Sequence, residues 1–411
     1  MTRSLGENIA ARIDELAALS DEEGKLTRLY LGPAHKAAVN LVSDWMRQAS
    51  MSVRLDTIGN VVGRIDGQHA QSPTLLIGSH IDSVRDAGRF DGPLGVITGL
   101  AVVEQLQREG RRLPFAVEVI AFGDEEGVRF PSTLGGSRAL AGSFDPALLE
   151  ETDAAGISRR DALIAFGCDP DAMVSDTRDP AALLGYVEVH IEQGPVLETE
   201  NLPVGIVNAI CGATRGRVDI TGERGHAGTV PMALRKDALA AAAEMILAIE
   251  AQAKREDGLV ATVGQIELAA PAPNSVPGEA RFSLDLRAPR DAQRGAALAD
   301  IEASIGSIAA ERNVSARLSI THEAPATSCD PNLMQLLEES VRADGFRPYL
   351  LPSGAGHDAM AFRDRVPVAM LFVRCRGGIS HHPAEFAAAE DIDAAARVLQ
   401  GFIERLAAQV T

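Results

Sequence analysis

An apolar run that ends abruptly in polar residues is the feature that most constrains the fold of this chain. Leu75–Ile77 is apolar, Gly78 follows, and the chain then releases His80, Asp82 and Asp91 into a glycine-rich stretch. A short apolar run bounded by glycine is typical of a buried strand. The sequence therefore predicts a buried strand that ends in imidazole and carboxylate groups.

Two later stretches repeat this design. VEVIAFGDEEG (117–127) ends in Glu125 and Glu126, and GYVEVHIEQGP (185–195) carries His190 at the end of its apolar run. In open α/β sheets, ligands bind outside the carboxyl ends of the strands. Three such strand ends predict one cleft with a shared active site.

The first part of the chain alternates strand-like and helix-like patterns. Residues 1–19 have amphipathic-helix spacing, and residues 20–48 have a helical pattern in two pieces broken at Gly32-Pro33. Strands are expected at 53–56, 60–65, 115–122 and 186–191, with a helix at 95–108. This alternation predicts an α/β fold with a mainly parallel sheet and covering helices. Residues 141–183, rich in Asp, Ala and Pro, are expected only to pack against the rest.

The pattern changes near Cys211. A strand at 215–222, a helix at 234–254, strands at 259–266 and 281–287, a helix at 290–312 and a strand at 315–321 follow one another. That order, βαββαβ, predicts a ferredoxin-like unit. An alternating pattern then returns, with helices at 332–344 and from about Asp391, a strand near Tyr349, GAGHDAM leading into a helix and a strand at 366–373. We expect a large domain in two parts, 1–211 and 327–411, with a smaller domain, 212–326, inserted between them.

Composition limits the partners and the compartment. The formal net charge of −18 and the pI near 5.0 argue against nucleic acid or an anionic membrane as a partner. Four scattered cysteines form no CxxC pair, and no apolar run approaches the ~20 residues of a membrane span. We therefore expect a cytoplasmic protein with unpaired thiols.

The polar residues at the strand ends form a sulfur-free ligand set that suits Zn, Mn, Co or Ni. A set of this size favours two divalent ions that share Asp91. Asp82, two residues after His80, is expected to orient that imidazole ring from outside the metal site. The candidate ligands are His80, Asp91, Glu125, Glu126, His190 and one of His381 or His382.

The inserted domain offers a different chemistry, in His226, Asn274 and Arg287. Arg287 lies near the end of a predicted strand and could bind a substrate carboxylate, because a guanidinium presents paired donors to a planar anion. The chain has no HExxH, no P-loop, no GxSxG and no GxGxxG that opens a helix after a strand, which argues against nucleotide and serine-hydrolase chemistry.

Taken together, these motifs resemble the M20-type dinuclear metal hydrolases, and among them the hydantoinase/carbamoylase amidases. The resemblance covers most of the chain and several motifs in one order: GSHIDSVRDAGRFDGPLG, FGDEEGVRF, GSRAL, HIEQGPVLE, GHAGTVPM, PNSVPG, GAGHDAM and GGISHHPAEF. It implies a zinc-peptidase-like catalytic domain, with an inserted domain that forms a homodimer and closes over the metal site.

The resemblance also implies roles for individual residues. His80 and His190 would hold one ion, Glu126 and His381 the other, and Asp91 would bridge them. Here the histidine that follows Ser380, His381 rather than His382, matches the ligand. Glu125 matches the general base and His226 the oxyanion-stabilising histidine, which would serve the partner subunit. The matching substrate contacts are Gln193, Arg215, Asn274 and Arg287, whereas Ala213 stands where glutamine is usual.

The activity implied is hydrolysis of a terminal ureido group that releases ammonia and carbon dioxide. Allantoate is the favoured substrate, and N-carbamoyl-L-amino acids are the alternative. A peptidase of the wider M20 group and a binding protein without catalysis are two further hypotheses. The ions would be zinc or manganese, with cobalt or nickel as alternatives.

Overall fold

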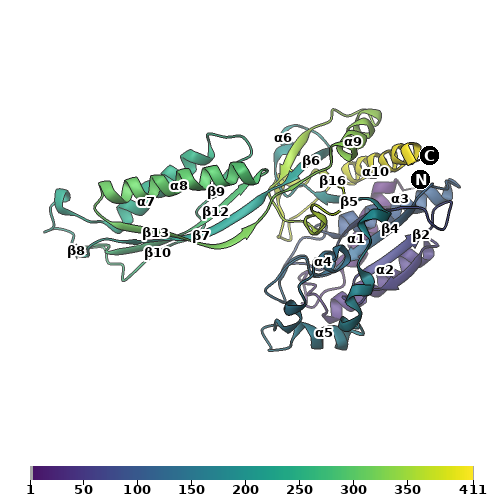
Figure 1. The fold of residues 1–411 in the computed structure, drawn as a ribbon, viewed down its shortest axis with the longest axis horizontal. Coiled ribbons are helices and arrows are strands. Elements are labelled where there is room, and N and C mark those ends of the chain that lie inside the picture. Colours follow the sequence, from purple (N-terminus) through teal and green to yellow (C-terminus); the bar gives the residue numbers. More distant parts are fainter. Residues whose placement is uncertain (1–2, 411) are drawn as a thin grey trace. The chain divides into compact units, whose positions relative to one another are not determined.

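The computed structural model describes residues 3–410, which divide into two compact units. One comprises 1–208, 329–351 and 355–411, and the other comprises 209–328 and 352–354. The second unit contains the predicted insertion, 212–326, and extends beyond it at both ends. Figure 1 draws both units.

The larger unit contributes most of a sheet in the order β1-β2-β4-β3-β5-β16-β6-β14, with β15 beside β6; β14 and the last residues of β6 and β15 fall in the residue ranges of the smaller unit. Its four central strands, β4, β3, β5 and β16, run parallel, whereas the flanking pairs are antiparallel. The predicted mainly parallel sheet is confirmed for this central part. The strands are β1 (Ser52–Leu55), β2 (Val61–Ile65), β3 (Thr74–His80), β4 (Ala116–Phe122), β5 (Leu183–Ile191), β6 (Val204–Ile210), β14 (Thr327–Ser328), β15 (Leu350–Ser353) and β16 (Val368–Val373).

Helices cover this sheet through one continuous apolar core. Alternate residues of the central strands, such as Leu75 and Ile77 of β3, belong to it together with Ile9, Ile97 and Phe402 from three of the helices. Because side chains alternate across a strand, His80 points to the opposite face from Leu75 and Ile77. The helices are α1 (Leu5–Ala17), α2 (Pro33–Gln48), α3 (Pro93–Arg108), α4 (Gly135–Ala141), α5 (Arg159–Phe166), α6 (Val196–Thr199), α9 (Pro331–Ala343) and α10 (Ala389–Val410).

The prediction of a helix just before Gly32 is wrong. Residues 20–31 form a loop in which the Ser20 hydroxyl accepts the main-chain N–H groups of Glu22 and Thr27. The buried Arg28 side chain donates to the main-chain carbonyls of Leu16, in α1, and of Ile81, just after β3. Hydrogen bonds from side chain to backbone compete with helix formation, which explains the failure of the pattern here.

The smaller unit is a five-stranded antiparallel sheet in the order β10-β12-β7-β13, with β9 beside β12. Figure 1 shows α7 and α8 together along one face of this sheet. The even-numbered residues of β7, such as Val218 and Ile220, pack on these helices, so the odd-numbered residues face the other way. The elements are β7 (Gly212–Thr221), β8 (Gly225–His226), α7 (Ala238–Ala253), β9 (Val260–Thr262), β10 (Ile266–Leu268), β11 (Ser275–Val276), β12 (Glu279–Ala288), α8 (Asp291–Glu311) and β13 (Ser315–Ala324).

This order matches the expected βαββαβ unit, with two local corrections. The predicted strand at 259–266 is broken into β9 and β10, and α7 begins at Ala238, where Asp237 caps it, rather than at 234. In the larger unit, GAGHDAM leads only into a short 3-10 helix, Asp358–Phe362, and not into the predicted longer helix.

Within the described part of the chain, no helix is both long and apolar enough to cross a bilayer.

Candidate metal centre

The ends of the parallel strands bring two predicted ligands together. β3 and β5 are neighbours and parallel, and His80 and His190 lie at their carboxyl ends. The two imidazole rings are 5.8 Å apart between centroids, and both side chains are buried. The predicted convergence of strand ends is therefore present for β3 and β5.

Asp91 lies between two groups of donors. Its Oδ1 is 3.4 Å from Nε2 of His80 and 3.1 Å from Nε2 of His190. Its Oδ2 is 3.3 Å from Nε2 of His381, which is itself 3.7 Å from the carboxylate of Glu126. The two oxygens of one carboxylate thus face two separate sets of nitrogen and oxygen donors.

These donors fit divalent metal ions. The ligand atoms of His80, Asp91 and His190 lie within 4.8 Å of one another, and so do those of Asp91, Glu126 and His381. Imidazole and carboxylate without sulfur suit zinc, manganese and related ions. The arrangement supports a divalent metal site at this edge of the sheet.

Main-chain carbonyls orient the two buried imidazole rings. Nδ1 of His80 is 3.0 Å from the carbonyl oxygen of Asp82, and Nδ1 of His190 is 2.9 Å from that of Ile191. A proton on Nδ1 leaves Nε2 of each ring free to bind a metal. The Asp82 carboxylate was predicted to orient His80, but the carbonyl of Asp82 is closer to Nδ1, and the carboxylate is 3.8 Å away.

The Asp82 carboxylate instead holds the turn that carries two other site residues. It accepts the main-chain N–H groups of Glu125 and Glu126, each at 3.2 Å. Burial raises the pKa of Glu125 well above its usual value, with further increases from the Glu126 and Asp358 carboxylates. Burial and the charge of Asp91 raise the pKa of Glu126 to about 7. A positive charge nearby would stabilise the ionised form of both the Glu125 and the Glu126 carboxylates.

Sequence reasoning missed the residue that holds Asp91. Glu385, only 3% exposed, accepts the main-chain N–H groups of Phe90 and Asp91 at 2.7 and 3.1 Å. The Ser380 hydroxyl donates to Asp91 at 2.7 Å and lies 3.1 Å from the Glu385 carboxylate. Gln193, predicted as a substrate contact, donates its amide N–H to Asp91 at 2.8 Å. The GGISHHPAEF motif contains Glu385, but nothing in its spacing indicates this contact.

A buried ion pair holds the residue that precedes Glu125 and Glu126. Asp124, the preceding residue, has a positive φ of 68° and pairs with the guanidinium of Arg159. Neither side chain is exposed. Arg159 belongs to α5 and also binds Glu151 at 2.9 Å. The expectation that residues 141–183 serve only for packing is therefore incomplete.

A second missed group lies behind His190. Glu188 and His357 are buried, and the ring of His357 is 4.6 Å from that of His190 between centroids. The Glu188 carboxylate accepts from the hydroxyls of Ser79 and Tyr186 and from the main chain of Ala359. These hydrogen bonds fix the Glu188 carboxylate, and one ligand atom each of Glu188, His190 and His357 lies within 4.8 Å of the others. A polar residue two positions before His190 in a buried strand was the available signal.

The smaller unit arranges the remaining predicted residues in pairs. His226 of β8 pairs with Ser275 of β11. The N–H of Ala227 donates to the carbonyl of Asn274 at 2.9 Å. His226 and Asn274 therefore lie on adjacent segments. Nδ1 of His226 accepts the N–H of Gly228 at 3.2 Å, which leaves the Nε2 proton of this exposed ring as a donor.

Arg215 and Arg287 lie on the adjacent strands β7 and β12. Both bind the carboxylate of Asp285. Ala213, which departs from the related motif, is directly opposite Arg287 in the strand register. The structure thus places the four predicted substrate residues in two locations: Gln193 at the metal centre and Arg215, Asn274 and Arg287 on the smaller unit.

Comparison with known proteins tests the resemblance. Residues 76–405 match the profile of Peptidase family M20/M25/M40. The chain belongs to this family. Within the M20 family, it is 42% identical to allantoate deiminase of Arabidopsis thaliana, over 97% of this chain and 82% of that protein.

Other M20 relatives agree with the predicted branch. N-carbamoyl-L-amino acid amidohydrolase of Geobacillus stearothermophilus is 40% identical over 98% of both chains. The crystal structure of a hydantoinase/carbamoylase family amidase from Burkholderia multivorans superposes with a TM-score of 0.92, at 32% identity over 97% of both chains. The predicted resemblance is confirmed, and these relatives support an amidohydrolase of C–N bonds other than peptide bonds.

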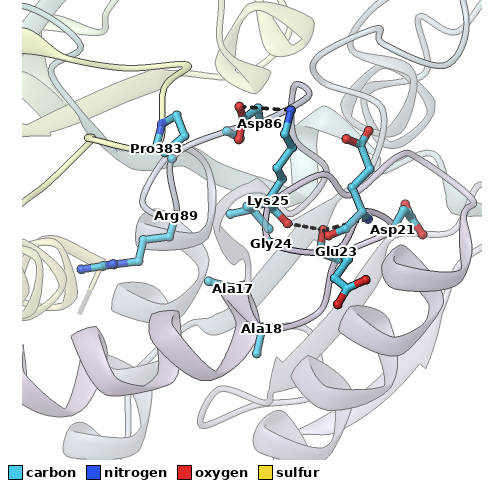
Figure 2. Close-up of a pocket in the computed structure, with 14 residues that line it drawn as sticks. Ala17, Ala18, Asp21, Glu23, Gly24, Lys25, Asp86, Arg89 and Pro383 are labelled. Carbon is cyan, nitrogen blue, oxygen red and sulfur yellow. Dashed lines mark hydrogen bonds and ion pairs between the residues drawn. The ribbon is translucent and has the colours of Figure 1, made fainter.

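The M20 chain also has a cavity of about 630 Å³ away from these residues (Figure 2). It is lined by the end of α1, the 20–26 loop, residues 86–89 and Pro383. Two of its charged residues, Lys25 and Asp86, pair with each other at 3.5 Å. None of the predicted catalytic, substrate or metal residues lines this cavity, so it is not the candidate active site.

Proposed function

We propose that this member of the M20 family hydrolyses the terminal ureido group of a small carboxylate-bearing molecule. The observation that carries the proposal is the position of Asp91, whose two oxygens face separate donor sets, with the Glu125 carboxylate within 4.8 Å of a ring nitrogen of His80. Allantoate is the favoured substrate, because an allantoate deiminase is 42% identical to this chain. N-carbamoyl-L-amino acids are the second candidate, because an amidohydrolase that is named for them is 40% identical.

Two divalent ions, zinc or manganese, would complete the site. His80 and His190 would hold one, Glu126 and His381 the other, and Asp91 would contribute one oxygen to each. When bound, such ions polarise a carbonyl and make a water molecule acidic enough to attack near neutral pH. Cobalt or nickel would suit the same donors.

Glu125 is assigned the proton transfers. Its carboxylate would accept a proton from the attacking water and deliver it to the leaving nitrogen. Positioned proton transfer of this kind typically contributes about 10²–10⁴-fold to the rate. The hydrogen bonds from the Glu125 and Glu126 amides to Asp82 fix the turn that carries Glu125. The carbamate released would decompose to ammonia and carbon dioxide.

His226 and the arginines of the smaller unit are assigned to the substrate. The Nε2–H group of His226 would donate a hydrogen bond to the oxyanion that forms at the carbamoyl carbon. Asn274 lies beside His226, and Arg287 would bind the substrate carboxylate. Gln193 would act mainly by holding Asp91, to which it donates a hydrogen bond.

We also infer a homodimer that forms through the smaller unit, and a cytoplasmic location. Met232, Leu234 and Leu247 of this unit are 65–77% exposed, and apolar side chains of this size favour burial in an interface. The four cysteines are free thiols, which suits a reducing compartment. Light scattering of the purified protein tests the dimer; a monomer at micromolar concentration would contradict it.

An ammonia assay tests the activity. Protein stripped with chelator and reloaded with manganese, zinc, cobalt or nickel is offered allantoate, ureidoglycolate, N-carbamoyl-β-alanine and several N-carbamoyl-L-amino acids. We expect the fastest ammonia release from allantoate. Faster release from N-carbamoyl-L-amino acids would favour the second candidate, amino acids released from dipeptides would indicate a peptidase, and inactivity on every compound would indicate a binding protein.

A further inference from the structure

Asp285 joins the two arginines that are assigned to the substrate. Its Oδ1 accepts from Nε of Arg287 at 2.7 Å, and its Oδ2 accepts from Nη2 of Arg287 at 3.0 Å. The same Oδ2 accepts from Nε of Arg215 at 3.0 Å. Asp285 is directly opposite Arg215 in the register of β7 and β12 and two residues before Arg287, so all three side chains lie on the same face of the sheet.

This arrangement leaves part of the Arg287 guanidinium available. A guanidinium carries five N–H donors. Asp285 uses the one on Nε and one on Nη2, and the main-chain carbonyl of Gly354 uses one on Nη1. One donor therefore remains on each terminal nitrogen, and Arg287 is held by its Nε side.

Asp285 also partly offsets the positive charges of Arg215 and Arg287. Partial burial alone would raise the pKa of Asp285, but the hydrogen bonds and charges of Arg287 and Arg215 lower it below its usual value. Asp285 is therefore an anion between two cations, and the three residues together carry a net positive charge. Without Asp285, the two guanidinium groups would repel each other at close range.

We propose that Asp285 is a positioning residue for substrate recognition, which holds Arg287 and Arg215 so that their remaining N–H donors bind the carboxylate of the ureide. This inference rests on the proposed function, and it adds a residue that does not itself touch the substrate. Loss of the Asp285 charge weakens the hold on both guanidinium groups, so that binding of the carboxylate must then restrict them further.

The same sheet contains a matched control. Asp219 of β7 accepts from Nε of Arg217 at 2.9 Å and from Nε of Arg281 at 2.6 Å. This second Arg–Asp–Arg cluster lies on the same face of the sheet but includes none of the residues assigned to the substrate. Asp219→Asn removes a similar ion-pair cluster and leaves the carboxylate-binding residues in place.

The experiment measures kcat and KM for the carboxylate-bearing ureide that the wild-type enzyme hydrolyses best. The variants are Asp285→Asn, Arg287→Ala, the double variant and Asp219→Asn. We expect Asp285→Asn to raise KM about fivefold to tenfold, the scale of one partly exposed bidentate ion pair, with kcat within about twofold. Asp219→Asn should leave both constants unchanged. In the Arg287→Ala background, Asp285→Asn should have a smaller effect than in the wild type, because only the contact of Asp285 with Arg215 is then left to lose.

Each other outcome is decisive. An unchanged or lower KM for Asp285→Asn, an equal increase in Asp219→Asn, or a full additional effect in the Arg287→Ala background would overturn the role of Asp285 and leave the proposed function intact. If the wild-type enzyme hydrolyses no ureide, the proposed function and this inference fail together. Thermal unfolding of the variants identifies any loss of kcat that comes from misfolding.

Discussion

Glu385 accepts the main-chain N–H of Asp91 at 3.1 Å, so the residue that lies between the two donor sets is held by a carboxylate nearly 300 positions away in the chain. The same oxygen accepts the N–H of Phe90. Asp91 is thus fixed through its backbone by Glu385 and through its side chain by Ser380 and Gln193. The position of Asp91 depends on the end of the chain as much as on its own loop.

Glu385→Gln should weaken metal binding. The amide cannot accept both N–H groups as strongly as a carboxylate, and loss of such supporting contacts typically lowers metal affinity about 10–100-fold. Metal content after dialysis against a limiting chelator measures this effect. Glu390→Gln, an exposed carboxylate in the first turn of α10, is the control and should keep its metal. Equal metal content in both variants would refute the role of Glu385.

Glu125→Gln and Glu126→Gln should separate catalysis from metal binding. Glu125→Gln should retain bound metal and lose about 10²–10⁴-fold in kcat, because a glutamine cannot carry the proton. Glu126→Gln should lose metal, because it removes an anionic donor 3.7 Å from His381. Metal analysis and ammonia release from the same samples give both values. Substantial turnover by Glu125→Gln would exclude its role as the base.

Sequence patterns located the candidate ligands but not the residues that hold them in place. His80, His190, Glu125 and Glu126 follow apolar runs, and such strand ends are visible in the sequence. Glu385 and Arg159 act through contacts with residues far away in the chain, and neither lies at a strand end. Their roles could be found only once the fold was known.

The fold, too, was predictable only where burial leaves a pattern in the sequence. Apolar runs and helical periodicity identified the central strands and the order of the inserted unit, because burial imposes these patterns. The loop at residues 20–31 was mistaken for a helix, because its structure depends on the Ser20 hydroxyl and on the buried Arg28. Such contacts leave no periodic pattern.

Arg159→Met should destabilise the larger unit. It leaves the Asp124 carboxylate buried without its cation, a change that typically costs about 3–5 kcal/mol. Urea unfolding measures the loss. Its neighbour Arg160 is the matched control, because it forms only surface ion pairs with Glu150 and Asp171, and Arg160→Met should unfold like the wild type. Similar unfolding of the two variants would show that the buried pair is not needed.

Asp56 should make stability depend on pH. Burial, together with the charge of Asp176, raises its pKa to about 7. The folded protein then holds this proton more tightly than the unfolded chain, in which an aspartate titrates near ~4. The contribution of Asp56 to the free energy of unfolding is therefore present below about pH 4 and decreases as pH rises towards about 7.

Asp56→Asn tests this dependence, because the amide has no proton to lose. The difference in the free energy of unfolding between wild type and variant should become smaller from pH 5 to pH 7, as measured by urea unfolding at both values. A difference that stays constant would show that Asp56 does not titrate in this range. Arg54, which pairs with Asp176 nearby, should be left unchanged in both proteins.

A metal titration tests the central claim, that Asp91 joins two metal sites into one hydrolytic centre. Chelator-stripped protein is supplied with increasing manganese or zinc, and ammonia release from the preferred ureide is followed. We expect no activity without metal and a plateau at about two equivalents per chain, with Asp91→Asn inactive at every metal concentration. Full activity in metal-free protein, or in Asp91→Asn, would contradict it.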